Sequence, residues 1–264
     1  MAKMKARYLY IVLAAAVAFS IVGCAKKEPT EKPAEAPAAP AAAPVDLATA
    51  GIVAGSVKLE GTPPKPKRIR MDAEAACVGL HTSPVYDQEV VTGEAGALAN
   101  VVVYVKQGLG NRTFATSSGS VVLDQQGCLY HPHVVALQTN QTLEVTNSDP
   151  TTHNIHPLPK NNREWNKSQS PKGEKLSEKF AREELAIPVK CNVHPWMKSY
   201  IAVFKHPYFQ VTDKGGSFEL KNLPPGEYTI GAWHEKLGET EQKVTLGPKE
   251  TKKIDFVFKA QAGD

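Results

Sequence analysis

The chain has 264 residues, with 31 basic and 27 acidic side chains and a formal charge of +4. Three of the basic residues, Lys3, Lys5 and Arg7, belong to an N-terminal segment that we expect to be removed, which leaves the remainder at about +1. A nearly neutral chain without a basic cluster gives no sign of nucleic-acid binding. The sequence also lacks a CxxCH motif, so covalent attachment of a c-type haem is excluded.

Residues 1–23 have the organisation of a secretory signal, with basic residues followed by an apolar segment too short for a confident membrane span. Ile21-Val22-Gly23-Cys24 resembles a bacterial lipobox, which implies cleavage before Cys24 and lipid attachment to its thiol. An uncleaved anchor or a plain signal peptide is the alternative. No Asp follows Cys24, which favours the outer membrane over the inner one. We therefore expect a lipid-anchored, periplasm-facing protein of the cell envelope.

Residues 24–50 are rich in Ala, Pro, Glu and Lys and contain no aromatic side chain, so we expect an extended linker without a core. Folded sequence begins near Gly51. The composition predicts strands at 52–60 and 98–105, and further strands at 121–123 and 134–137. Residues 63–97 show no regular pattern and contain Cys77.

Two stretches in the middle of the chain carry candidate metal ligands. Residues 152–157 read Thr-His-Asn-Ile-His-Pro and follow an alternating strand at 142–147. Residues 191–197 read Cys-Asn-Val-His-Pro-Trp-Met and lie between predicted strands at 187–190 and 200–204. One thiolate, two imidazoles and a thioether form the ligand set of a blue-copper electron-transfer site. Residues Cys191, His194 and Met197 recur every three positions, so one tight loop can wrap around an ion, with His153 or else His156 joining from the other loop.

The C-x-x-H-P-x-M motif, preceded by an H-N-x-H loop, resembles the cupredoxin family, and most of all its amicyanin and plastocyanin branch. The resemblance covers roughly residues 120–205. It implies that His153, Cys191, His194 and Met197 hold one type 1 copper ion. It also implies that Asn154 ties the two loops together and supports the thiolate.

The same resemblance implies a route for electrons. The outer edge of His194 would face solvent, surrounded by an apolar docking patch of Pro157, Pro195 and Trp196. Such a patch suits the weak, transient encounters of a redox protein with its partner. We therefore expect a carrier of single electrons, and not an enzyme, since no catalytic triad, phosphate loop or small-molecule substrate site is evident. The alternative is a non-redox envelope binding module or a copper store.

The run T-D-x-x-G-x-F-x-L-x-N-L-P-P-G-E-Y at 212–228 resembles the carboxypeptidase regulatory-like, transthyretin-like β-sandwich, a family whose motif specifies a fold and not a function. Strands typical of the beginning of that family occur at 55–59 and 98–105. We therefore expect an all-β chain in which a cupredoxin-like domain at 119–206 is inserted into a sandwich formed by 51–118 and 207–260. Two tandem sandwiches divided near residue 206 are the alternative.

Four cysteines remain to be accounted for in this scheme. Cys24 would carry lipid and Cys191 would bind metal, which leaves Cys77 and Cys128. An oxidising compartment favours a disulfide between these two. The alternative is that one of them joins a second metal site.

Overall fold

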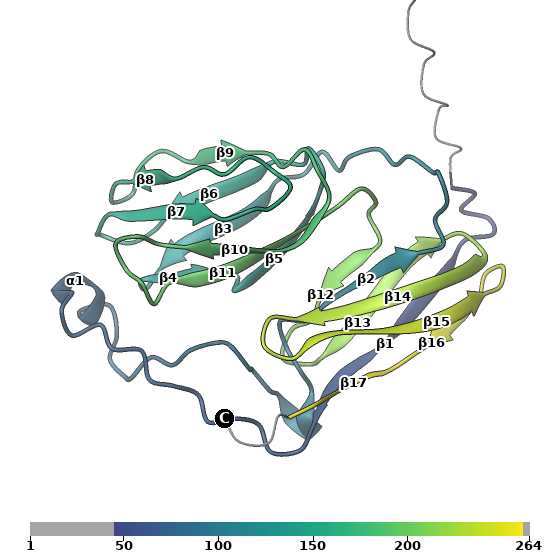
Figure 1. The fold of residues 1–264 in the computed structure, drawn as a ribbon, viewed down its shortest axis with the longest axis horizontal. Helices are drawn as coiled ribbons and strands as arrows, with labels where there is room; N and C mark the ends of the chain where they lie inside the picture. Colours follow the sequence, from purple (N-terminus) through teal and green to yellow (C-terminus); the bar gives the residue numbers. More distant parts are fainter. Residues whose placement is uncertain (1–44, 261–264) are drawn as a thin grey trace, which may run out of the picture. The chain divides into compact units, whose positions relative to one another are not determined.

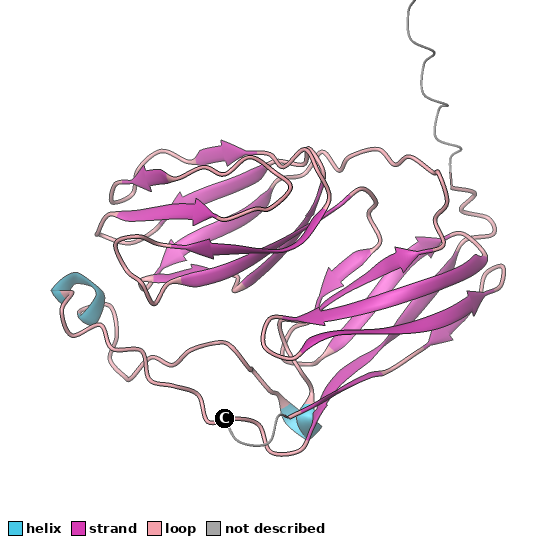
Figure 2. Cartoon of the chain, in the orientation of Figure 1, coloured by secondary structure: helices cyan, strands magenta, loops and turns pink. Residues whose placement is uncertain are grey.

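The computed structural model describes residues 45–260. The predicted signal segment, Cys24 and most of the predicted linker lie outside the described residues. The described part is nearly all β, as the sequence predicts (Figure 2). Its helices are the single turn α1 (Ala75–Val78) and the 3-10 turn η1 (Glu94–Gly96). Neither of these turns, nor any other helix within 45–260, is long and apolar enough to cross a membrane.

Two of the sheets in this part of the chain combine strands from its beginning and its end. One contains β1 (Gly51–Glu60), β13 (Ser217–Leu223), β16 (Thr251–Lys253) and β17 (Phe256–Lys259). The other contains β12 (Phe209–Val211), β2 (Val102–Gln107), β14 (Gly226–His234) and β15 (Gly238–Leu246). Alternate side chains of these strands point inward and form one apolar core that includes Val53, Leu220, Ile230 and Phe256.

The other two sheets are built entirely from residues between β2 and β12. The order in the larger sheet is β5 (Val134–Gln138), β11 (Lys198–Phe204), β10 (Glu184–Lys190), β7 (His153–Pro157) and β8 (Lys167–Gln169). The order in the smaller is β4 (Leu129–His131), β3 (Val121–Gln126), β6 (Leu143–Asn147) and β9 (Leu176–Glu178). These strands make up the second pair of sheets (Figure 1). Leu123, Leu137, Val145 and Ile201 lie in the core of this pair, which also contains Cys191.

Strand β2 is buried on both faces over its first four residues, which explains its unbroken apolar sequence. One face contributes Val103 and Val105 to the first core. The other places Val102 and Tyr104 in a third apolar cluster with Phe204 of β11, whose ring centroid lies 4.8 Å from that of Tyr104.

A buried histidine beside this cluster predicts an acid-sensitive fold. His206 stacks on Phe204, and burial lowers its pKa to about 4. An unfolded histidine has a pKa of about 6.5, so below that pH the unfolded chain binds a proton that the folded chain excludes. The free energy of unfolding is therefore unaffected by protonation of His206 above pH 6.5. As the pH falls from 6.5 towards 4, protonation of His206 in the unfolded chain lowers this free energy by up to about 3 kcal/mol.

His206→Gln should accordingly flatten the pH dependence of the unfolding free energy between pH 6.5 and 4. Denaturant unfolding of both proteins across this range measures the difference. His234, whose pKa burial also lowers to about 4, is the internal reference, since its contribution is retained in the variant. An unchanged slope in His206→Gln would show that His206 takes up its proton without unfolding.

Candidate metal centre

The sheet order brings the two predicted ligand loops together. Strands β7 and β10 are antiparallel neighbours, with Lys190 paired to His156, so the start of β7 lies near the end of β10 (Figure 1). The loop after β10 is closed by the pairing of Lys190 with Lys198 at the start of β11. Within this loop the backbone N–H of Met197 donates to the carbonyl oxygen of His194 at 2.9 Å. Residues 191–197 therefore form a tight turn beside His153.

Three of the predicted ligands converge in the interior. Nδ1 of His153 lies 2.8 Å from Nδ1 of His194, and Sγ of Cys191 lies 3.9 Å from the latter atom. The ligand atoms of all three residues lie within 4.8 Å of one another. All three side chains are buried, and Met197 is fully buried in the same apolar cluster as Cys191.

Backbone hydrogen bonds prepare the sulfur of Cys191 to carry negative charge. The N–H groups of Asn154 and His194 each donate to Sγ at 3.4 Å. Burial by itself raises the pKa of the Cys191 thiol, but the hydrogen bonds from His153 and from these N–H groups bring the pKa below its ordinary value. A thiolate is the form of cysteine that binds metal.

The side chain of Asn154 lies between the two loops. Its Oδ1 accepts a hydrogen bond from the backbone N–H of Asn192, and its Nδ2 donates to Oδ1 of Asn166. One side chain therefore connects the loop of His153, the loop of Cys191 and the segment before β8.

A buried aspartate, absent from the sequence interpretation, orients His153. Oδ2 of Asp149 lies 2.8 Å from Nε2 of His153 and accepts a hydrogen bond from it. Burial lowers the pKa of His153, but the hydrogen bonds and charges of Asp149 and Cys191 together outweigh burial and raise the pKa overall. Because Asp149 binds Nε2, Nδ1 is the ring nitrogen on the side of Cys191 and His194. Nδ1 would bind a metal once it carries no proton. The one feature of the sequence that could have indicated this contact is the position of Asp149, four residues before His153.

Asp149 also fixes the hairpin that carries Cys128. Gly127 and Cys128 form the two-residue turn between β3 and β4, with φ angles of 63° and 53° that are typical of a type I′ turn. The N–H groups of Gly127 and Cys128 donate to the Asp149 carboxylate at 2.6 and 2.7 Å. The left-handed conformation of Cys128, uncommon for a residue with a side chain, is stabilised by this carboxylate.

His156, the alternative ligand, takes part in a different set of contacts. Its Nε2 lies 2.7 Å from Oε1 of Glu164, and its Nδ1 lies 3.2 Å from Oδ1 of Asn192. No candidate metal-binding group within residues 45–260 includes it. The geometry therefore favours His153.

The prediction that an edge of the His194 ring faces solvent is wrong, because a disulfide covers the ring. Cys77 and Cys128 are bonded to each other, and Sγ of Cys77 lies 3.7 Å from Nε2 of His194. His194 is only 1% exposed as a result. The irregular segment at 63–97, for which the sequence predicts no structure, covers the loop at 191–197 through Cys77 of α1.

The expected docking patch is also different in composition. Pro157 is buried in β7 and cannot contribute to a surface. Pro195 is exposed and Trp196 is half-buried, with its ring centroid 5.1 Å from that of His194. The indole Nε1 of Trp196 donates to the carbonyl oxygen of Cys128 at 3.1 Å, which fixes the ring against His194.

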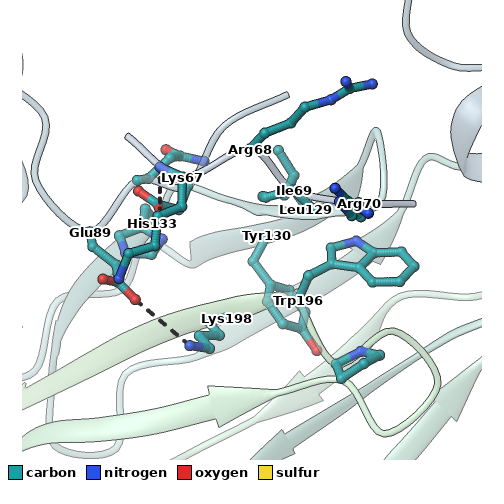
Figure 3. A pocket seen from close by; sticks show the side chains of 13 residues that line it. Lys67, Arg68, Ile69, Arg70, Glu89, Leu129, Tyr130, His133, Trp196 and Lys198 are labelled. Atoms are coloured by element: carbon teal, nitrogen blue, oxygen red, sulfur yellow. Dashed lines mark hydrogen bonds and ion pairs between the residues drawn. The ribbon is translucent and has the colours of Figure 1, made fainter. Parts of the chain in front are cut away.

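Trp196 lines a pocket of about 350 Å³ on the surface (Figure 3). The apolar side chains around the pocket are Ile69, Leu129, Tyr130, Pro195 and Trp196. The basic side chains are Lys67, Arg68, Arg70 and Lys198, of which Lys198 pairs with Glu89 at 3.8 Å. The ring of Trp196 thus lies between the pocket and the buried His194.

The donor chemistry of this site fits copper. A cysteine with a lowered pKa, two Nδ1 atoms facing each other and a buried thioether in the same loop combine soft sulfur with imidazole.

Comparisons with known proteins found similar structures and no related sequences. No protein-family model matches the chain, and no curated protein matches it. Among solved structures, a Cu-containing nitrite reductase from Thermus scotoductus SA-01 is 18% identical over 37% of this chain, with a TM-score of 0.31. The match spans 25% of the nitrite reductase chain.

Two smaller proteins are also similar. A variant of amicyanin in the Cu(I) form is 17% identical, with a TM-score of 0.29, over 38% of this chain and 97% of that one. A purple cupredoxin from Nitrosopumilus maritimus is 24% identical, with a TM-score of 0.25, over 28% of this chain and 81% of that one.

Proposed function

We propose that this protein is a lipid-anchored, periplasm-facing type 1 copper protein that carries single electrons between redox partners. The observation that supports this most directly is the convergence of Cys191 Sγ with Nδ1 of His153 and Nδ1 of His194 in a buried site. Copper bound there supplies a one-electron couple, since thiolate suits Cu(I) and imidazole suits both oxidation states.

Each ligand would have a role that its surroundings support. Cys191 would bind as a thiolate, held by the N–H groups of Asn154 and His194. His153, oriented by Asp149, would present Nδ1 together with that of His194. Met197 would supply the weakly bound thioether of the set. Burial of all these side chains excludes water and limits rearrangement when the charge of the site changes.

The surface around Trp196 would receive the redox partner. The ring contact between Trp196 and His194 offers the electron a short path through the covering layer. The pocket beside it carries four basic and two acidic side chains, so a partner with an acidic face would be attracted. The encounter would be transient, as electron carriers require.

The anchoring and the domain arrangement belong to the same proposal. Lipid on Cys24 would hold the folded part at the membrane, and we place the protein at the outer membrane in preference to the inner one. The pairing of β2 with β12, on either side of residues 121–204, supports an inserted copper domain within a transthyretin-like sandwich. Metabolic labelling with radioactive palmitate, compared between the native chain and Cys24→Ala, tests the anchor, and equal labelling would exclude it.

The visible and EPR spectra of the purified chain after addition of Cu(II) test the central claim. An intense thiolate-to-copper band, narrow hyperfine splitting and reversible one-electron reduction are expected. Stoichiometric copper without reversible reduction would identify a copper store instead. A colourless protein that still folds would exclude the copper centre and leave a binding module.

Two histidine variants separate the ligand assignments. His153→Asn should abolish the intense band, because it removes one of the two Nδ1 donors beside Cys191. His156→Asn is the matched control and should keep the band, since His156 contacts Glu164 and Asn192 instead. Spectra recorded at equal copper loading make the comparison, and the opposite result would assign His156 as the ligand.

A further inference from the structure

A second set of sulfur donors lies on the other side of His194. While Nδ1 of His194 faces Cys191, its Nε2 lies 3.7 Å from Sγ of Cys77. The donor atoms of Cys77, Cys128 and His194 all lie within 4.8 Å of one another, and the three side chains are buried. The disulfide therefore lies directly against the loop at 191–197 that carries the candidate ligands.

Reduction would change the chemistry of this cluster. Disulfide sulfur is uncharged and a poor ligand, whereas cysteine thiolate is the species that binds metal. A small dithiol can donate two electrons and two protons to the Cys77–Cys128 bond, so that it is itself oxidised to a disulfide and two protein thiols form. Binding of a soft ion then releases the two thiol protons and, where Nδ1 of His194 already holds copper, also the ring proton on Nε2.

Hydrogen bonds that do not involve the disulfide hold both cysteines in place. Asp149 fixes the turn that contains Cys128. The carbonyl oxygen of Cys128 accepts a hydrogen bond from Nε1 of Trp196. The backbone N–H of Cys77 donates to the carbonyl oxygen of Glu74 at 2.9 Å. Just beyond α1, His81 Nε2 lies 2.8 Å from the carbonyl oxygen of Gly127, which joins the covering segment to the turn that carries Cys128. The two sulfurs therefore remain neighbours when the bond between them is broken.

We propose that reduction of the Cys77–Cys128 disulfide creates a second metal site, which binds one Cu(I) ion through the thiolates of Cys77 and Cys128, with Nε2 of His194 as third donor. Two thiolates suit Cu(I), which prefers soft sulfur ligands. The oxidation state of this cysteine pair then decides whether the chain binds one copper ion or two. The second site lies beyond the proposed electron-transfer function and does not require Cys191.

Copper stoichiometry of the full chain in its two thiol states tests the proposal. One sample keeps the disulfide, and the other is reduced anaerobically with a phosphine that is then removed. Thiol titration after denaturation verifies the two states. Each sample is titrated with Cu(I) in competition with a chromophoric Cu(I) chelator. We expect one additional tightly bound equivalent in the reduced sample, and equal stoichiometry in both samples would overturn the proposal.

Three variants locate the additional ion. Cys191→Ser should still gain one equivalent on reduction, because the second site does not use Cys191. Cys77→Ser/Cys128→Ser should gain none, and a gain in this variant would overturn the assignment by showing that Cu(I) binds elsewhere. If the double variant does not fold, Cys128→Ser alone, which leaves one thiol, takes its place, and full retention of the additional equivalent there would equally overturn it.

Failure of the proposed electron-transfer function would look different. A disulfide-containing chain that shows no intense visible band with Cu(II) would exclude the centre at Cys191. The additional Cu(I) equivalent on reduction would still be measured independently of that band. X-ray absorption of the reduced Cys191→Ser variant with one Cu(I) bound counts the sulfur ligands of the second site directly. Two sulfur ligands are expected, and fewer would contradict the site.

Discussion

Replacing Cys191 with Ser should remove the intense visible absorption of the Cu(II)-loaded chain completely. The band would arise from charge transfer between thiolate sulfur and copper, and a serine hydroxyl supplies no sulfur. The pKa of the Cys191 thiol, raised by burial, is brought below its ordinary value by hydrogen bonds that favour the thiolate. The replacement is nearly isosteric, and its oxygen can still accept from the N–H groups of Asn154 and His194. Loss of colour with little change in the unfolding transition of the copper-free protein would therefore report on the metal centre alone.

Ser199→Ala provides a matched control for that experiment. Ser199 is buried at the start of β11, close in sequence to the metal-binding loop, and its hydroxyl has no hydrogen-bond partner among the described residues. Its removal should leave the colour unchanged and stability equal or slightly higher, because a buried hydroxyl without a partner is costly. Full colour in Cys191→Ser would contradict the assignment, since no other free cysteine lies within residues 45–260.

Asp149→Asn should weaken both the fold and the metal centre. The carboxylate accepts hydrogen bonds from Gly127, Cys128 and His153, and an amide can satisfy these donors only in part. We expect a loss of about 3 kcal/mol in the free energy of unfolding, since hydrogen bonds to a buried charged group contribute about 1.5–3 kcal/mol each. Copper affinity should fall about 10- to 100-fold, as is typical when the partner of a ligating histidine is removed.

Asp124→Asn is the control for the second experiment. The Asp124 carboxylate also accepts two hydrogen bonds, from the hydroxyl groups of Thr146 and Ser148, and neither of these involves His153. Its replacement should cost some stability and leave copper affinity unchanged. Equal losses of affinity in the two aspartate variants would show that Asp149 acts through general destabilisation and not through His153.

The convergence of Cys191, His194 and His153 could be predicted because the information for it is local. Cys191, His194 and Met197 are spaced along one short loop, and His153 stands in a second recognisable motif, so residue types and spacing suffice. The role of Asp149 as the hydrogen-bond partner of His153 could not be predicted, because an aspartate before a proline is equally typical of an ordinary turn. Its contact with His153 depends on how the turn after β6 meets β7.

The covering of His194 had no sequence signal at all. Residues 63–97 lack hydrophobic periodicity, so nothing in the segment indicates where it packs. Elimination among the four cysteines suggested that Cys77 and Cys128 pair, but not that the bond would lie against Nε2 of His194. Pro157 was assigned to a surface patch from the family resemblance, whereas β7 continues through this residue and buries it.

The position of β1 has a mechanical consequence. Under the proposed lipid anchor, any pull from the membrane reaches the folded part of the chain at Gly51, the first residue of this strand. Strand β1 is hydrogen-bonded to β13 on one side and to β16 and β17 on the other. Because ladder hydrogen bonds run across the strands, tension along β1 loads many of them in shear at once and does not open them one by one. Under the proposed anchor, this strand would therefore resist force applied at its start.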